Sequence, residues 1–493
     1  MSLLEELAPL TRLRWLRLLA LITLLVVVGV VSFRLKLSVI DLDVWWHLKV
    51  GDWIIAHAAF PHHGILSRSA ANRPWAAYSW GYEVLLSRFY AWFGLLGIGI
   101  YGTLLTLAVA FAVYWMARRL SERFWPACVL AVVCCYAFLF LIMPRPMFFS
   151  IILFCLTLTQ ILEAQRSGRI RTLYWLPLIF LFWANLHIQF IYGLAVVGLL
   201  VATNAAQRLA ARLGFALEFL QPPSLPLDAL ASVFAACVLA TLIGPYSYHL
   251  YGVILDYAHS KVIYATIKEL LPLGFRGYEN YAELLLAAAA FFAIGWQKKV
   301  DLFKLGLLAM ASVVGLRTMR DSWFLCIAAA ACIADAAGEA AEREPQETPL
   351  ELAGVLATTA LVLLLFARGA DFTTRGLDGA ISSMFPVNAV NFLRQNPVPG
   401  PLYNTIDWGG FLIWYMPNYP VVIDGRTDLY GDRLFKLLFD TQNGEASYKT
   451  NPYLNQAGVV LLRRQDGLVA ALDMDPRFRK IYEDRMATVF VRQ

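Results

Sequence analysis

The stretch WLRLLALITLLVVVGVVSFRLKL occupies residues 15–37 and is the first long apolar run of the chain. Its length is enough to cross the hydrocarbon core of a bilayer as a tilted helix. Arginines gather at its beginning, and positive charge favours the inner side of a membrane. We therefore predict that this helix starts inside and ends outside, on the basis of Arg12, Arg14 and Arg17.

Two carboxylates follow this helix almost at once. Asp41 and Asp43 are separated by a single residue, and Trp45-Trp46-His47 comes directly after them. The predicted orientation places both acids at the outer membrane face, beside tryptophans of the kind that favour the interface. An enzyme that activates a hydroxyl next to a lipid-borne substrate needs acids in such a place.

The composition is that of a polytopic membrane protein. Of the 493 residues, 59% are hydrophobic and only 15% are charged, and the mean hydropathy is +0.59. Soluble domains have about 45–50% apolar and about 25% charged residues. The net charge of +6 fits basic loops on one side of a membrane, and no basic tract with interleaved aromatics points to nucleic acid.

Apolar runs recur along the chain and predict about eleven transmembrane helices. The inner loops that this count implies are basic, apart from the acidic loop 338–349, and an odd count places the C-terminus outside. The predicted spans are 15–37, 92–117, 125–143, 146–163, 172–185, 188–205, 229–243, 281–297, 302–316, 322–337 and 350–367.

The predicted fold class is thus an α-helical polytopic membrane protein with a small C-terminal extracytoplasmic α/β domain. Residues 1–370 form the transmembrane domain, with an outer loop at 38–91 that carries interfacial helices and a second outer loop at 244–280. Residues 371–493 form the α/β domain, because short helical and strand-like runs alternate there. Its expected helices lie near 387–394 and 408–416, and its strands at 401–403, 421–423, 459–462, 478–482 and 488–491.

Polar residues gather at the outer ends of the predicted spans, at the level of Asp41 and Asp43. Charges at a membrane edge are costly and therefore candidates for function. Arginines there can hold a phosphate or diphosphate, and a carboxylate can accept the proton of an attacking hydroxyl. The arginines are Arg145, Arg317 and Arg320, and the supporting polar residues are His47, Asn185, His187 and Asp321.

Each of these residues also has a structural explanation. The acids could cap the helix that follows them, and Arg145 could extend its charge to the interface. Arg320 and Asp321 could pair with each other, and Asn185 and His187 could satisfy backbone groups at a helix break.

Several motifs resemble the GT-C glycosyltransferase superfamily of polytopic membrane proteins, as found in bacteria. The likeness covers most of the chain and begins at the acidic pair in the first outer loop. It rests on Asp41–Leu48, Gly51–Ile54, Pro74-Trp75, Arg145-Pro146, Trp183–His187, Gly244–Tyr246, Tyr403-Asn404, Asp407–Gly410 and Asp424–Asp428. One departure is Gly64, since relatives would have an acid in the stretch 61–67.

The resemblance implies an inverting transfer of a sugar from a polyprenyl-phosphate-linked donor to an acceptor glycan, lipid or protein on the outer face. Asp41 or Asp43 would be the catalytic base, and either could help to hold Mg²⁺ or Mn²⁺ if a metal takes part. In the C-terminal domain, Asp407, Asp424, Arg426 and Asp428 are candidates for acceptor binding, and Asp424-Gly425 could equally be a plain turn.

Two other functions compete with this one. A non-catalytic scaffold for envelope or polysaccharide assembly would use the C-terminal domain to bind a protein. A transporter of lipid-linked sugars is less favoured, because it would carry polar residues to the middle of the bilayer and show inverted repeats. In each case we expect a multi-pass protein of the bacterial inner membrane, with a cytoplasmic N-terminus.

Overall fold

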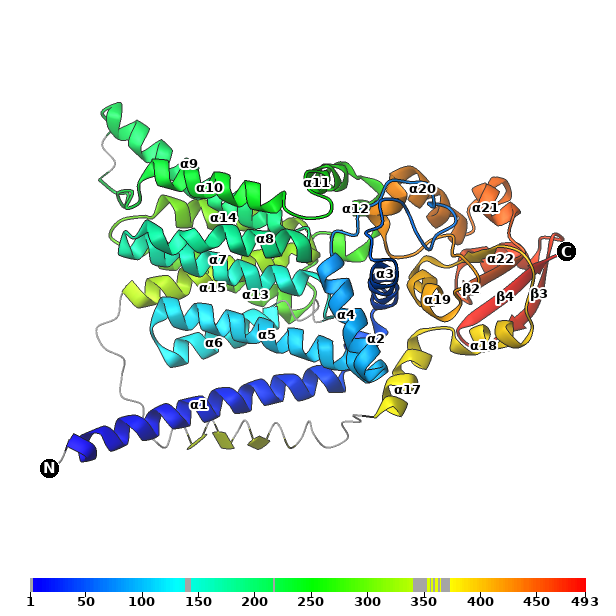
Figure 1. Ribbon diagram of the computed structural model, residues 1–493, viewed down its shortest axis with the longest axis horizontal. Helices are drawn as coiled ribbons and strands as arrows, with labels where there is room; N and C mark the ends of the chain where they lie inside the picture. The colour runs from blue at the N-terminus through cyan, green and yellow to red at the C-terminus, as the bar shows by residue number, and fades with distance from the viewer. Residues whose placement is uncertain are drawn as a thin grey trace. The chain divides into compact units, whose positions relative to one another are not determined.

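The computed structural model describes residues 3–137, 143–215, 218–339 and 373–493, with short pieces at 353–354, 356–357, 360–361 and 364. The chain is mainly helical and ends in a small sheet (Figure 1). It forms two compact units. Unit 1 contains Met1–Leu35, Gly102–Gly244 and Glu269–Asp371, and unit 2 contains Lys36–Tyr101, Pro245–Lys268 and Phe372–Gln493.

Unit 1 is built from apolar helices. Five helices in the described part of the chain are long and apolar enough to cross a membrane, namely Arg17–Ile40, Leu95–Ser121, Met147–Ser167, Phe190–Arg212 and Met319–Glu339. The helices are α1 (Leu3–Arg34), α5 (Leu95–Ser121), α6 (Phe124–Ala137), α7 (Met147–Ser167), η2 (Ile170–Trp175), α8 (Leu176–Leu186), α9 (Phe190–Arg212), α10 (Leu227–Thr241), α13 (Tyr278–Gly295), α14 (Leu302–Arg317), η4 (Met319–Asp321) and α15 (Ser322–Glu339).

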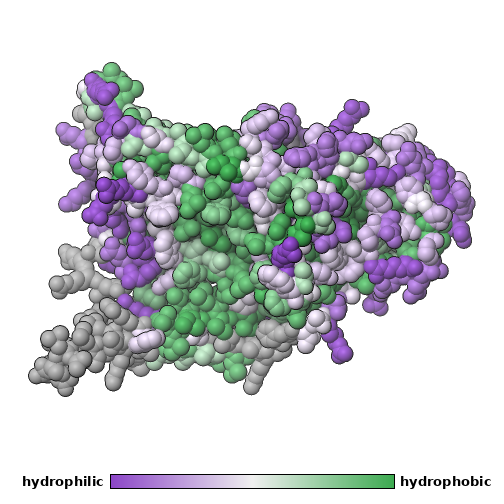
Figure 2. Space-filling model, viewed as in Figure 1, coloured by the Kyte–Doolittle hydropathy of each residue, from purple (hydrophilic) through white to green (hydrophobic). Residues whose placement is uncertain are grey.

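The surface of unit 1 is suited to lipid. Figure 2 shows a largely apolar surface over these helices, with polar side chains gathered at their left-hand end. Large apolar side chains such as Phe182, Leu239, Phe292 and Val313 are more than half exposed. In water such a surface would be unfavourable, and in hydrocarbon it is not.

Each predicted span before 350–367 coincides with a helix of the structure. The span 172–185 starts as the 3-10 helix η2 and becomes α-helical only at Leu176, where Pro177 takes a first-turn position. Most of 350–367, and 138–142 of the third span, lie outside the described residues. A multi-pass helical protein is therefore shown, and the count of eleven stays a prediction.

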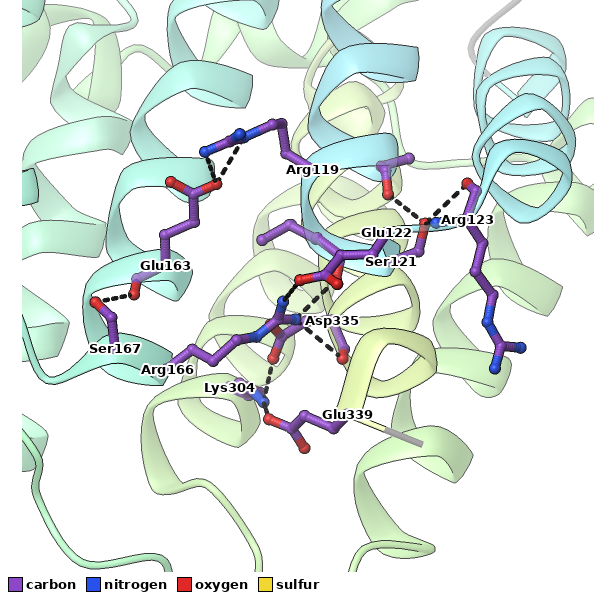
Figure 3. A network of polar contacts seen from close by, with 12 residues as sticks. Arg119, Ser121, Glu122, Arg123, Glu163, Arg166, Ser167, Lys304, Asp335 and Glu339 are labelled. Carbon is purple, nitrogen blue, oxygen red and sulfur yellow. Dashed lines mark hydrogen bonds and ion pairs between the residues drawn. The ribbon is translucent and has the colours of Figure 1, made fainter. Parts of the chain in front are cut away.

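A charged network joins four helices at one end of unit 1 (Figure 3). Arg166 of α7 and Asp335 of α15 form an ion pair, with 2.6 Å between Nη2 and the carboxylate. Asp335 also pairs with Lys304 of α14. Arg119 at the end of α5 binds Glu163 at 2.8 Å. Lys304 and Asp335 are both buried, so each charge is stabilised by the other and not by water.

Unit 2 combines short helices with a four-stranded sheet. The sheet order is β1-β2-β4-β3, in which β1 (Leu402–Asn404) and β2 (Val459–Arg463) are parallel and β4 (Ala487–Arg492) is antiparallel to β2 and to β3 (Phe478–Glu483). The helices are α2 (Leu37–Ile40), α3 (Val44–His57), α4 (Trp80–Phe93), α11 (His249–His259), α12 (Val262–Thr266), η3 (Lys268–Leu270, at the boundary with unit 1), α17 (Thr374–Met384), α18 (Val387–Gln395), η5 (Ile406–Trp408), α19 (Gly409–Tyr415), α20 (Thr427–Gln442), η6 (Ala446–Thr450), α21 (Pro452–Asn455) and α22 (Gly467–Asp473).

The small C-terminal sheet confirms four of the predicted strands, and the prediction for 421–423 is wrong. That segment is extended and buried, but it forms only a single bridge, between Ser67 and Val421. Its backbone N–H and C=O groups form hydrogen bonds with side chains instead. The amide of Val422 donates to Oδ1 of Asn404 at 2.8 Å, and the carbonyl of Ile423 accepts from Nδ2 of Asn404 at 2.8 Å. An asparagine thus replaces a neighbouring strand.

Candidate active site

The acidic pair lies in unit 2, where the chain passes from α2 into α3. Asp41 is only 1% exposed, and its Oδ1 accepts the backbone N–H of Asp43 at 3.2 Å. Asp43 is partly exposed and makes no side-chain cap on α3. Its Oδ1 accepts the indole N–H of Trp46 at 2.9 Å. The two acids therefore differ, since Asp41 is buried and supports the backbone, whereas Asp43 is partly exposed.

Helix α3 is held in place by residues from the far end of the sequence. Trp45 is fully buried and contacts Phe385, Phe411 and Tyr415 edge to face, with ring centroids 6.2, 6.1 and 5.2 Å away. A side chain on Gly410 would meet the carbonyl oxygen of Leu42 at 2.6 Å. Helix α19 can therefore approach the acidic pair only because it begins with glycines.

Next to Asp43, the side chains of Asp424, Arg426 and Tyr430 form a buried cluster of hydrogen bonds, called the lock below. Arg426 donates to both oxygens of Asp424 at 2.8 and 2.7 Å, and the hydroxyl of Tyr430 donates to Asp424 at 2.7 Å. Although burial alone would raise the pKa of Asp424, the charge of Arg426 lowers it. Asp424 and Arg426 are 0% and 1% exposed, so the pair stabilises the loop from within.

Asp428 and Asp407, the other acids proposed for acceptor binding, are more open. Asp428 accepts the indole N–H of Trp75 at 3.1 Å, and the guanidinium of Arg426 lies 4.8 Å from the centre of the same ring. Burial raises the pKa of Asp428 to about 6, although the charge of Arg426 opposes this. Asp407 forms an ion pair with Arg463. The structure thus brings Asp424, Arg426 and Asp428 together and leaves Asp407 with a different partner.

Glu83 is a residue that sequence reasoning missed. It lies on α4, is 1% exposed and shares a hydrogen bond of 3.0 Å with Nδ1 of His47. Its second oxygen has no hydrogen-bond partner within the described residues, and burial raises its pKa well above the usual range. An acid in the aromatic run Trp80–Phe93 was the signal that could have identified it.

Gly64, where relatives would have an acid, is a position without room for a side chain. A Cβ there would lie 2.2 Å from the carbonyl oxygen of Ala70 and 2.9 Å from Leu429. In this chain a second acid cannot occupy that position without moving the backbone around it.

The proposed phosphate-binding arginines belong to unit 1. Arg145 binds Glu269 at 2.6 Å, while Arg317 is exposed and Arg320 is half-buried. Burial would raise the pKa of Glu269, but the charges of Arg145 and Arg320 lower it. Glu269 is thus a counter-ion of Arg145 and lies near Arg320.

The supporting polar residues of unit 1 are well anchored. Nδ1 of His187 shares a hydrogen bond of 2.8 Å with the hydroxyl of Ser150, whose oxygen accepts the indole N–H of Trp183 at 2.7 Å. Burial and the charge of Arg320 lower the pKa of His187 well below its usual value. Asp321 accepts from Gln189 at 2.7 Å.

Asn185 bears out the structural explanation that the sequence left open. Its side-chain amide donates to the carbonyls of Leu181 and Ile243, each at 2.8 Å. It therefore satisfies backbone groups where α8 ends.

Metal binding remains a prediction for the acidic pair. No three His, Cys, Asp or Glu side chains among the described residues lie close enough to hold a metal ion together. Asp41 and Asp43 offer carboxylates from two positions only, and any further ligands would have to come from water or substrate.

The fold is similar to that of solved membrane glycosyltransferases. No family model matches the chain, and no curated protein matches it in sequence. The oligosaccharyltransferase AglB from Archaeoglobus fulgidus, in complex with an inhibitory peptide and a dolichol-phosphate, has a TM-score of 0.54 at 11% identity. The match covers 88% of this chain and 69% of AglB.

The apo form of the Archaeoglobus fulgidus oligosaccharyltransferase has a TM-score of 0.51 at 12% identity, over 90% of this chain and 69% of that one. At such identity the likeness concerns the fold alone. It confirms the predicted resemblance to the GT-C superfamily at that level.

Proposed function

We propose that this protein is a membrane glycosyltransferase that moves a sugar from a polyprenyl-phosphate-linked donor to a hydroxyl group of an acceptor. The observation that carries the proposal is the arrangement of Asp43. This residue is partly exposed, its carboxylate is oriented by Trp46, and it follows Asp41 just after a helix that can span a membrane. A lipid-linked donor would present its sugar at that level of the bilayer.

Asp43 is the proposed general base, because Asp41 is buried and already accepts a backbone N–H. The acceptor oxygen attacks the anomeric carbon of the donor while its proton passes to Asp43. The bond between that carbon and the phosphate oxygen breaks, and polyprenyl phosphate leaves with the bonding electrons. A positioned base contributes about 10²- to 10⁴-fold to such a step.

Arg145 and Arg320 are the proposed ligands of the leaving phosphate. Guanidinium groups match the geometry of phosphate oxygens and remain charged at any physiological pH. When the donor binds, its phosphate would replace the carboxylate of Glu269 as the partner of Arg145. One anion then takes the place of another beside the guanidinium group. AglB, which has a similar fold, was solved with a dolichol-phosphate, and this supports a lipid phosphate as the donor class.

The finer assignments follow from the sequence and are part of the same proposal. The transfer takes place on the outer, periplasmic face of a bacterial inner membrane, with the N-terminus in the cytoplasm. Residues 371–493 form the extracytoplasmic domain, and this domain contributes to acceptor recognition. The mechanism is inverting, as the resemblance implies.

The test is turnover of donor by the purified protein in lipid nanodiscs. Polyprenyl phosphates that carry different sugars are supplied singly, and released polyprenyl phosphate is measured, with water serving as a slow acceptor. We expect Asp43→Asn to lower kcat by about 10²- to 10⁴-fold, and Arg320→Ala to raise KM for the donor. Asp41→Asn should lower kcat less, because it acts through the backbone of Asp43.

Asp52→Asn is the matched control, because Asp52 is an exposed acid on the same helix α3. It should leave turnover unchanged. Full activity of Asp43→Asn would refute the proposed base. No turnover of any donor, together with recovery of a stoichiometric protein partner, would favour the scaffold function instead.

A further inference from the structure

A cavity of about 340 Å³ lies within unit 2, away from the acidic pair. Three parts of the chain form it: the turn that contains Trp75, the last residues of α11 and the first turns of α20. Ligand pockets in proteins begin at about 300 Å³, so the cavity can accommodate a small molecule.

The walls of the cavity are fixed by hydrogen bonds. Asp432 accepts the N–H groups of Lys261 at 2.7 Å and Val262 at 3.0 Å, and it also binds the hydroxyl of Ser260. Helix α20 is kinked at Gly431, whose φ of 63° is readily adopted only by glycine. The kink lets Asp428 and Asp432 border the same cavity. These contacts indicate a preformed site.

The chemistry of the lining favours a sugar. Tyr257 provides a ring on which the apolar face of a pyranose can stack, and Asp256 and Asp428 provide oxygens that accept hydrogen bonds from hydroxyl groups. Trp75 is largely buried and closes one wall of the cavity. Asp432 adds a further acid, and His259 is the only lining residue that can become positive. Such a lining disfavours a phosphate, so the donor headgroup does not belong here.

The cavity is also connected to the candidate active site. Arg426 packs against Trp75 and pairs with Asp424. Between these two residues of the lock lies Gly425, where a Cβ would stand 1.9 Å from Oδ1 of Asp43. The cavity therefore borders the segment 424–428, which contacts the proposed base, although Asp43 itself does not line the cavity.

We propose that this cavity binds a neutral or amino-bearing sugar unit of the acceptor. The sugar stacks on Tyr257, lies against the wall that Trp75 closes, and donates hydroxyl hydrogen bonds to Asp256 and Asp428. This inference rests on the proposed function, because it assigns the acceptor of that reaction to the class of glycans.

The test is direct binding of methyl glycosides to the full chain in nanodiscs, measured by saturation-transfer difference NMR. The panel contains hexosides, pentosides and 6-deoxyhexosides, together with one glucosaminide and one glucuronide. We expect at least one neutral or amino sugar to bind, and the glucuronide to bind at least tenfold more weakly. Asp256→Asn and Tyr257→Ala should each weaken binding about tenfold or more.

Tyr248→Ala is the matched control, since Tyr248 is an exposed aromatic that precedes α11 and does not line the cavity. It should bind sugar like the wild type. The inference is overturned if no glycoside binds, if Asp256→Asn and Tyr257→Ala bind as well as the wild type, or if methylamine binds as well as the glucosaminide. Donor turnover by the wild type is measured in parallel. If turnover is absent while sugar binding persists, the proposed function is wrong and the inference that the cavity binds a sugar is retained.

Discussion

The carboxylate of Asp43 depends on a residue that has no side chain. Gly425 faces Oδ1 of Asp43 so closely that a Cβ would lie at 1.9 Å, and the indole N–H of Trp46 donates to the same oxygen at 2.9 Å. The base is therefore confined by contacts from α3 and from the segment before α20. A small change in either contact should alter its direction.

Gly425→Ala should consequently lower kcat for donor turnover by at least tenfold while the protein still folds, because the methyl group displaces the carboxylate and not the backbone core. Gly379→Ala is the control, since a Cβ at Gly379 of α17 meets nothing within 4 Å. Steady-state kinetics of both variants test this, and equal rates would show that Asp43 is not confined in this way.

Asp428 should make the stability of the protein depend on pH. Its folded pKa is about 6, above its usual value of 3.8. Between about pH 4 and pH 6 the unfolded chain releases this proton while the folded chain keeps it, so stability falls as pH rises through that window. The measurement is the difference in denaturation midpoint between the wild type and Asp428→Asn. Between pH 4 and pH 6.5 we expect the wild type to lose stability relative to Asp428→Asn. A difference in midpoint that does not change with pH would contradict the prediction.

At the scale of the elements, buried polar groups connect helices that are distant in sequence. In unit 2 the lock formed by Asp424, Arg426 and Tyr430 fixes the start of α20. In unit 1 the network of Figure 3 joins α5, α7, α14 and α15 through Arg166, Lys304 and Asp335. Each network is tolerated because its charges are paired where water is excluded.

Lys304→Met should destabilise unit 1 by about 3–5 kcal/mol, because it leaves the buried charge of Asp335 with one cation fewer. Adding Asp335→Asn should recover part of the loss. Lys298→Met, at an exposed lysine before α14, should have no effect. Thermal unfolding in detergent measures all three. If Lys304→Met and Lys298→Met behave alike, the network does not stabilise the helix ends.

At the scale of the whole molecule, the segment that follows α1 and the C-terminal segment belong to one unit. Residues 36–101 pack with 372–493, and Trp45 inserts between Phe385, Phe411 and Tyr415. The end of the chain therefore serves as structural support for the acidic pair, in addition to any role in acceptor recognition.

A chain that ends at residue 372 should accordingly lose donor turnover by at least 10²-fold even though water is the acceptor in that assay. The helices of unit 1 should still form, as judged by circular dichroism of the purified protein. Retention of donor turnover would show that the C-terminal segment acts on the acceptor alone.

Much of this organisation could be predicted from local patterns. Apolar runs predict the helices of unit 1, because a backbone in hydrocarbon must satisfy its own hydrogen bonds, and alternating short elements predict the small sheet. The acidic pair was identifiable because it follows directly on a spanning helix. Glu83 stood out only as an acid in an aromatic run, and its hydrogen bond to His47 was not predictable because the two positions are 36 residues apart.

The amino-acid sequence by itself determined the membrane class, the positions of the helices and the acidic pair, since each of these depends on the chemistry of neighbouring residues. Only the tertiary structure decided that Asp41 is buried and Asp43 accessible, that Asp424 and Arg426 form a lock, and that residues 421–423 pair with an asparagine side chain. Asp43 is confined by Gly425 from the far end of the sequence, and Asn404 lies 18 residues before Val422. Asp424 and Arg426 are only two residues apart, but their burial depends on the packing around them, which no local pattern encodes.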